Sequence, residues 1–477
     1  MNIAKKAIRG VIFVGGSNYL LYLINFIGGI ILARLLEPEL FGIIALSQFF
    51  LSLSGRIKEL GFEQGLINRQ ENWEDFANNH LSLQMIFGGA SIMLNSLLSI
   101  IVAWRYGQTM GLVLFISGLF GIMGAFSATY LKIFEKELMF KQSTILDLLN
   151  GILAQAGMVV MALRGFGIWS LVFGGLLGAI PYTFLIWKIS PVKLKFSWDK
   201  EKIKWFFNFG PWWHWFFAAT ASMVILQFDN LLVGTILGAA TLGFYSRAYN
   251  WATLPTSRLA AIISRVAYPI YAKLQSDSVR LSYAFNLTLS AIVRVTLPIG
   301  IIGLFIIREG TLFLIGEKWL ALVPMFQALF LYMILRPLFD DTGALFMAVG
   351  KPKIINSVQV WQALLILAID PLLVHFFGAV GAGVGAGLAM LLGITLLYPS
   401  LKQIVKVDFN EIFVKPFSAG AITLLLFLFL IRHLVFPSVI ISLIGKLVIF
   451  LPMYLVILFV LEGKKWLNYR DLWKNLG

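Results

Sequence analysis

The sequence predicts an all-α integral membrane protein with about fourteen transmembrane helices, arranged as two six-helix lobes and two C-terminal helices. Three observations predict this fold: an apolar composition, apolar segments of spanning length, and an internal repeat. Of the 477 residues, 59% are hydrophobic and 13% are charged, whereas a soluble domain carries about 25% charged residues. Because the chain contains no cysteine, disulfides and thiolate-bound metals are excluded.

A helix needs about 20 apolar residues to cross the hydrocarbon core of a bilayer. The segments that meet this requirement are 10–33, 40–58, 79–104, 109–131, 143–163, 166–187, 207–236, 240–263, 283–307, 321–346, 354–376, 379–401, 416–434 and 438–461. The first segment is too long for a signal peptide, so we interpret it as a retained helix. The pattern is weakest in 240–263, because that segment contains Arg247, Arg258 and Pro255.

The positive charges alternate with the predicted helices. If the N-terminus is inside, most of the 38 Lys and Arg residues fall in cytoplasmic segments, which is the positive-inside bias of multi-pass membrane proteins. The sequence therefore predicts a multi-pass membrane protein with both termini in the cytoplasm. The net charge of +15 is explained by this anchoring, so we expect no nucleic-acid partner.

The domain organisation follows from a basic segment and a repeat. ILARLLEPELFGII (31–44) aligns without gaps with LVGTILGAATLGFY (232–245), and LRGFGIWSLVFGGLLG (163–178) resembles FFGAVGAGVGAGLAML (376–391). Parallel repeats of this kind are typical of transporters, with the substrate path between the lobes. The predicted division is an N-lobe at 1–190, a basic cytoplasmic linker at 191–206, a C-lobe at 207–405, and two further helices with a tail at 406–477.

The residues of enzyme active sites are missing from the sequence. The four histidines are scattered without metal-ligand spacing, no GxxxxGK[ST] motif for ATP is present, and the loops are short. We therefore expect a protein that moves a substrate without converting it, with no cofactor and no metal.

Charged residues inside spanning helices are costly and usually face a bundle interior or an aqueous cavity. Asp229 and Arg247 lie equally far from Gly238, the predicted turn between two helices, so antiparallel helices bring them to the same depth. They form either a cavity pair that binds a polar substrate or coupling ion, or a buried ion pair that fixes helix packing. Their counterparts in the first repeat are uncharged.

Two other groups of charges are candidates for the cavity. Arg294 lies in the middle of its helix with no nearby partner in sequence, which favours a phosphate-binding role over a salt bridge to another helix. Arg336 and Asp340 are four residues apart on one helix face and predict an internal pair, with Asp341 adjacent. Asp370 lies near a helix end, and we interpret it as partly hydrated.

Aromatic side chains supply one more candidate site. Trp212, Trp213 and Trp215 in GPWWHWFF (210–217) are suited to stacking on sugar rings. The alternative is an interfacial belt, which is the commoner role of tryptophan at a helix end.

ILARLLEPELFG, QFDNLLVG, LGFYSRAYNWATLP (242–255) and RVAYPIYAKLQSD (265–277) resemble the polysaccharide transporter family, the Wzx-like flippases of the multidrug/oligosaccharidyl-lipid/polysaccharide exporter superfamily. The resemblance covers essentially the whole chain. It implies two six-helix bundles in a V around a central cavity, and a lipid-diphosphate-linked oligosaccharide as cargo, flipped from the inner to the outer leaflet of the bacterial inner membrane. It also implies that cavity cations receive the cargo and that a cation gradient, of Na⁺ or H⁺, drives the return. On this basis Arg247 and Arg294 are the expected cavity cations, and Asp229 is the expected acidic partner or coupling site.

The sequence therefore predicts a flippase that works by alternating access, with membrane lipids around it and a polysaccharide polymerase and chain-length regulator as partners. One alternative is a cation-coupled multidrug exporter of the same superfamily, which would favour acids over arginines in its cavity. A membrane polysaccharide polymerase or ligase would need a large outer loop bearing Arg or His, and a structural scaffold would not need unpaired charge in the membrane.

Overall fold

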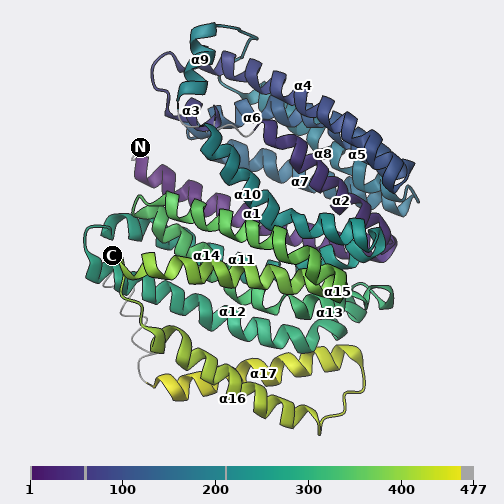
Figure 1. Ribbon diagram of the computed structural model, residues 1–477, viewed down its shortest axis with the longest axis vertical. Helices are drawn as coiled ribbons and strands as arrows, with labels where there is room; N and C mark the ends of the chain where they lie inside the picture. Colours follow the sequence, from purple (N-terminus) through teal and green to yellow (C-terminus); the bar gives the residue numbers. More distant parts are fainter. Residues whose placement is uncertain (1–2, 59–61, 210–211, 464–477) are drawn as a thin grey trace. The chain divides into compact units, whose positions relative to one another are not determined.

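The computed structural model describes residues 3–58, 62–209 and 212–463, except for the side chains of 3–14, 212–215, 218, 258 and 259. Within these ranges every regular element is helical (Figure 1), which confirms the all-α prediction. The chain forms two compact units, Met1–Met223 and Val224–Gly477. This division falls inside helix α10 (Trp212–Ile236), beyond the predicted linker.

The helices of the first unit are α1 (Ile3–Leu35), α2 (Pro38–Gly55), η1 (Arg56–Lys58), α3 (Phe62–Asn68), α4 (Trp73–Tyr106), α5 (Gln108–Leu119), α6 (Gly121–Lys136), α7 (Phe140–Leu163), α8 (Ile168–Ile189), α9 (Lys200–Asn208) and the first part of α10. Pro38 occupies the first turn of α2, where its missing N–H would have no partner in any case. The α7–α8 turn contains Gly165 at φ 80° and Gly167 at φ 55°, conformations that favour glycine.

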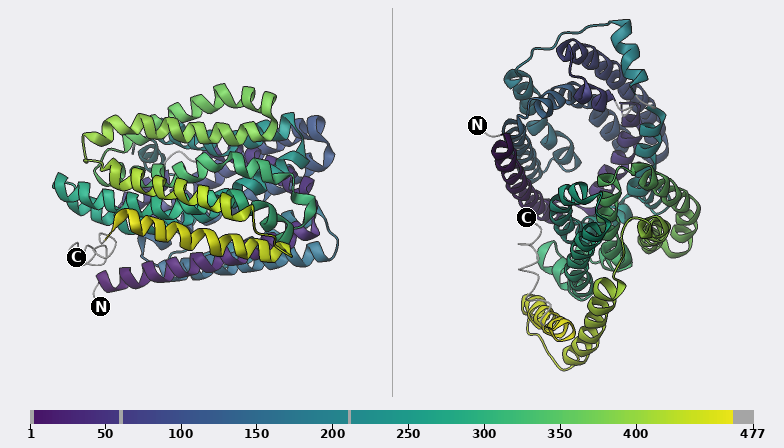
Figure 2. Two further views of the ribbon diagram at one scale, coloured as in Figure 1. Left: turned by 90° about the horizontal axis from the view of Figure 1, so that it is seen from below. Right: turned by 90° about the vertical axis from the view of Figure 1, so that its left-hand side faces the viewer.

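The second unit comprises the rest of α10, then α11 (Ala239–Leu274), α12 (Ser278–Leu314), η2 (Glu317–Trp319), α13 (Leu322–Ala328), α14 (Phe330–Ala348), α15 (Pro352–Lys402), η3 (Asn410–Val414), α16 (Lys415–Ile431) and α17 (Val439–Glu462). Figures 1 and 2 show α16 and α17 side by side at one edge of this unit, next to α12.

Helix α15 is a hairpin and not one straight rod. Its 51 residues would extend about 75 Å as a single helix, far beyond the roughly 30 Å hydrocarbon core. Gly378, at φ 62° and ψ −148°, breaks the helical conformation. Gln362 Nε2 then donates to the carbonyl of Ala389 at 2.9 Å, which requires the two arms to run antiparallel. The sequence prediction of two helices separated near 377 matches this turn.

By length and hydropathy, eleven helices in the described part of the chain are able to span a membrane, or twelve if the bent pair α13–α14 is one span. The predicted number of about fourteen is not confirmed. The eleven include α15 as a single helix although it has two arms, and they omit α11, whose polar residues lower its hydropathy.

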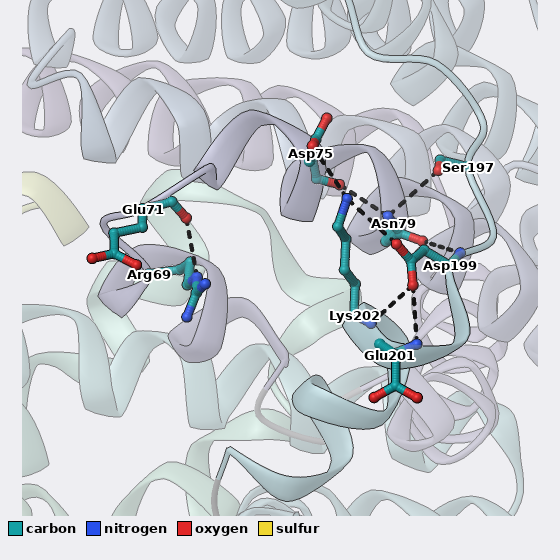
Figure 3. A network of polar contacts seen from close by, with 8 residues as sticks. All are labelled: Arg69, Glu71, Asp75, Asn79, Ser197, Asp199, Glu201 and Lys202. Atoms are coloured by element: carbon teal, nitrogen blue, oxygen red, sulfur yellow. Dashed lines mark hydrogen bonds and ion pairs between the residues drawn. The ribbon is translucent and has the colours of Figure 1, made fainter.

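In each unit the last helix of the repeat is followed by a short segment, here called a strap, whose backbone is hydrogen-bonded to the side chains of a long helix. In the first unit, Lys195 N donates to Asn78 Oδ1 at 2.7 Å, Ser197 N to Ser82 Oγ at 3.0 Å, and Asp199 N to Asn79 Oδ1 at 2.8 Å. Three alternate backbone N–H groups of this first strap, residues 191–199, are therefore satisfied by α4. Figure 3 shows Asn79 meeting Ser197 and Asp199.

The predicted linker is thus part of the first unit. Asp199 caps α9 by accepting from the backbone N–H groups of Glu201 and Lys202, and Lys202 forms an ion pair with Asp75 of α4 at 3.2 Å (Figure 3). The two backbone hydrogen bonds that Asp199 accepts, together with its own ion pair with Lys202, lower the pKa of the Asp199 carboxyl. Ile203 and Phe206 of α9 are buried in an aromatic cluster with α3 and α4.

The second strap, residues 403–408, uses the same chemistry in the second unit. Lys406 N donates to Ser282 Oγ at 2.9 Å and Asp408 N to Asn286 Oδ1 at 3.0 Å, both on α12. Each unit therefore satisfies an extended segment with Asn and Ser side chains near the start of a long helix. This recurrence supports the internal repeat beyond the aligned sequence motifs.

Candidate functional site

Asp229 of α10 is buried, with 4% of its surface exposed. Its Oδ2 accepts a hydrogen bond from the hydroxyl of Tyr245 on α11 at 2.6 Å, and its Oδ1 accepts from the backbone N–H of Asn230. The partner of Asp229 across the turn is therefore Tyr245 and not the predicted Arg247. Residues two apart on a helix point about 200° apart, so Tyr245 and Arg247 cannot both face α10.

Arg247 lies on another face of α11. Its guanidinium carbon is 5.8 Å from the centroid of the Trp319 ring in η2, a cation–π arrangement. The expected Asp229–Arg247 ion pair is replaced by two separate contacts, both within the second unit.

The polar network continues along α11 and α14. One turn beyond Tyr245, the Tyr249 hydroxyl is 2.5 Å from that of Tyr332 on α14. Arg336 Nη1 donates to the Tyr332 hydroxyl at 3.3 Å, and Arg336 Nε lies 2.9 Å from Asp340 Oδ1. The predicted pair between Arg336 and Asp340 is thus formed.

Asp341, next in sequence, faces a different set of groups and is fully buried. Its carboxylate accepts hydrogen bonds from Ser264 at 2.9 Å, Tyr271 at 3.1 Å and Thr288 at 3.3 Å. Three hydroxyl donors from α11 and α12 compensate for the lost water, so this residue joins three helices.

Asp370, in the first arm of α15, was expected to be partly hydrated but is only 1% exposed. The second arm covers it: a Cβ added at Gly385 would lie 1.9 Å from Asp370 Oδ1. Neither carboxylate oxygen has a hydrogen-bond partner among the described residues. Asp370 also lies within electrostatic reach of Asp229 and Tyr245. Two buried carboxylates in one region form an arrangement that a bound cation would stabilise.

The placement of Arg294 corrects the prediction that it lines the cavity. Its side chain is 9% exposed and forms ion pairs with Glu462 of α17 at 2.6 Å and with Glu411 of η3 at 3.1 Å. Both acids lie more than a hundred residues away in sequence. A second ion pair, Lys446 with Glu309 at 2.5 Å, joins α17 to α12 elsewhere. Arg294 therefore fastens the C-terminal helices to α12.

A polar cavity in the first unit contains cations that the sequence reasoning missed. It has a volume of about 400 Å³ and is lined by Gln48, Leu51, Ser52, Gly55, Arg56, Lys58, Glu63, Gln84, Gly124, Ala125 and Ala128. Gln84 is 2% exposed, and its Nε2 has no hydrogen-bond partner in the part of the chain that the structure describes. Arg56 donates to the carbonyl oxygens of Ser52 and Ala219. Arg56 and Lys58, which directly follow α2, were the signal that the sequence offered for this cavity. Basic residues at the end of a spanning helix are also expected as cytoplasmic anchors, so they were not distinguished from the other loop cations.

A second cavity, in the second unit, lies between α11 and α14. Its volume is about 440 Å³, and its lining residues are Ser257, Ala261, Ser264, Arg265, Tyr268 and Asp340. Helices α2 and α11 are the repeated pair in the sequence alignment, so the two cavities use corresponding helices. Of the remaining candidates, the side chains of Trp212, Trp213 and Trp215 lie outside the described residues.

Comparison with known proteins gives a consistent result. Residues 31–324 match a family model described as "Polysaccharide biosynthesis protein". The chain is 25% identical over 423 residues to the lipopolysaccharide biosynthesis protein WzxC of Escherichia coli K12, covering 83% of this chain and 81% of WzxC.

Among solved structures, the chain resembles lipid II flippase MurJ in an inward closed conformation, with a TM-score of 0.79, 16% identity, and coverage of 97% and 99% of the two chains. It also resembles an inward-facing MATE family transporter of the MOP superfamily, with a TM-score of 0.59, 15% identity, and coverage of 80% and 94%. The fold is that of transporters, and the resemblance stated from the sequence is confirmed.

Proposed function

Since the chain belongs to the polysaccharide biosynthesis protein family, we propose that it translocates a polyprenyl-diphosphate-linked oligosaccharide across the bacterial inner membrane. The cargo is a repeat unit of a surface polysaccharide, and translocation proceeds by alternating access. Both termini are cytoplasmic in this proposal, and a polymerase and a chain-length regulator act on the exported unit.

The observation that carries this proposal is the polar cavity of the first unit. Arg56 and Lys58 provide positive charge beside one acid, Glu63, and Gln48 and Gln84 provide amides. Arginine and lysine suit a diphosphate, while amides suit sugar hydroxyls. The cavity of the second unit offers Arg265, Tyr268 and two serine hydroxyls at corresponding helices.

We further propose that Asp229 and Asp370 bind the coupling ion, either Na⁺ or H⁺. Asp370 is buried and has two oxygens without hydrogen-bond partners among the described residues, so the loss of water raises the energy of its charged form. A cation or proton that enters during the return step would relieve this energy.

The second candidate function is cation-coupled drug export, which the buried acids Asp229, Asp341 and Asp370 favour. The two functions differ in the charge of the cargo. Removal of the buried acids would stop a drug exporter from transporting cationic cargo. Removal of Arg56 and Lys58 would instead stop a flippase from transporting a lipid-linked sugar.

The deciding experiment uses proteoliposomes that contain the full chain and a polyprenyl-diphosphate-linked oligosaccharide. Flipping is measured as the fraction of sugar exposed to an added glycosidase, with and without a Na⁺ or pH gradient. Exposure above that of protein-free vesicles supports the function. Equal exposure, together with export of a cationic dye, would establish the drug exporter instead.

A further inference from the structure

The first strap carries two aromatic side chains that are exposed although its backbone is hydrogen-bonded to α4. Alternate N–H groups, those of residues 195, 197 and 199, are directed at α4. The Ser197 side chain meets Asn79 of α4, and in an extended chain the side chains on either side of it point to the opposite face. Those side chains are Phe196 and Trp198, which are 69% and 57% exposed.

The second strap shows that this exposure is not a consequence of the strap itself. Ser197 and Lys406 both donate to a serine, and Asp199 and Asp408 both donate to an asparagine, so Phe196 corresponds to Val405 and Trp198 to Val407. Val405 is 2% exposed, and Val407 is partly buried. The same pattern of backbone hydrogen bonds therefore carries buried or partly buried valines in the second unit and exposed aromatic side chains in the first.

The exposed aromatics form one wall of a groove on the first unit. This linker groove has a volume of about 400 Å³ and is lined by Ser82, Met85, Ile86, Phe196, Ser197 and Trp198. Ile86 belongs to the candidate span Trp73–Tyr106 and is 51% exposed, so this side of α4 presents an exposed apolar surface. The groove thus opens where this apolar side of a candidate span meets a segment rich in lysine and aromatic residues.

We propose that the linker groove binds one anionic glycerophospholipid of the adjoining leaflet. An acyl chain packs on Met85, Ile86, Phe196 and Trp198, and aromatic rings of this kind prefer the headgroup level. Lys195 and Lys200 flank the two aromatics in sequence and are exposed, so they supply positive charge beside an anionic headgroup. A lysine near the membrane surface contributes about 1 kcal/mol of attraction to anionic lipid. Binding would hold the strap and α9 against the membrane surface.

The absence of cysteine from the sequence makes the test direct. The full chain with Ile86→Cys carries a bimane label and is reconstituted in phosphatidylcholine vesicles that contain a minor fraction of phosphatidylglycerol. The bromine quencher is placed on phosphatidylglycerol in one sample and on phosphatidylcholine in the other, at one lipid ratio. Met85→Cys provides a second labelling position if the first variant folds poorly.

We expect brominated phosphatidylglycerol to quench at least about fivefold more than its mole fraction predicts, the factor that one of the two lysines contributes. Lys195→Gln with Lys200→Gln should abolish this preference, and arginine at both positions should retain it. The matched control is Lys402→Gln with Lys406→Gln, which removes two exposed lysines at the second strap and should change nothing.

Three results would overturn the proposal. Quenching in proportion to mole fraction would show no anionic preference, and a preference that survives loss of Lys195 and Lys200 would place its origin elsewhere. Relief of quenching by unlabelled polyprenyl-diphosphate oligosaccharide would show that the groove holds the cargo's tail.

Discussion

Tyr245 donates a 2.6 Å hydrogen bond from its hydroxyl to Oδ2 of Asp229, across the turn at Gly238. Both side chains are buried, so this contact is the main compensation for a carboxylate removed from water. It also fixes the rotation of α11, which directs Arg247 toward Trp319 on another face.

Removal of the Tyr245 hydroxyl should destabilise the protein. Tyr245→Phe leaves Asp229 Oδ2 without its partner at a cost of about 1–3 kcal/mol, measured as a lower midpoint of thermal unfolding in detergent. Tyr268→Phe, which removes an exposed hydroxyl from the same helix, is the control. An unchanged midpoint for Tyr245→Phe would show that Asp229 is stabilised by other groups.

Arg294→Gln should act on stability, because it leaves Glu462 buried without its cation. The expected loss is about 3–5 kcal/mol, the range for breaking a buried ion pair. The double change Arg294→Gln with Glu462→Gln should recover part of this loss, since no charge is then stranded. If Arg294→Gln instead lowers flipping while the unfolding midpoint stays constant, the arginine faces the cargo as the sequence suggested.

Asp370→Asn should remove the effect of the coupling ion. An ion that binds only the folded protein raises its stability by about 2.7 kcal/mol at a concentration one hundred times Kd, and this gain should disappear in the variant. The matched control is Asp341→Asn, a buried aspartate whose carboxylate is satisfied by three hydroxyls. Ion-dependent stabilisation that persists in Asp370→Asn would exclude this residue from the ion site.

Arg56→Gln should lower the flipping rate at least tenfold, about 1.4 kcal/mol, because a charge-assisted contact to diphosphate is lost. Arg56→Lys should retain part of the rate, since the charge remains while the bidentate fork does not. Arg164→Gln, an exposed arginine in the α7–α8 turn, should leave flipping unchanged. Equal rates for Arg56→Gln and the unmodified chain would remove the first-unit cavity from the cargo path.

Local patterns were sufficient to predict much of the fold. The apolar runs, the turn at Gly238 and the linked motifs of the repeat all depend on a few neighbouring residues. The pair between Arg336 and Asp340 is also local, since one turn of helix brings the two side chains together. In contrast, the predicted span 240–263 is not among the helices that meet the length and hydropathy criteria, because α11 carries polar residues whose buried partners come from other helices.

The sequence by itself determined that this is a helical membrane protein with a repeat and with charges placed inside its helices. Only the tertiary structure decided which groups those charges meet. Depth along a helix follows from residue spacing, but rotation about its axis is set by packing, so Tyr245 and not Arg247 faces Asp229. Arg294 likewise finds its acids on helices that pack against α12 from far along the chain. Asp370 is buried because Gly385 lets the second arm of α15 approach it, and such closeness of distant residues has no signal in local sequence.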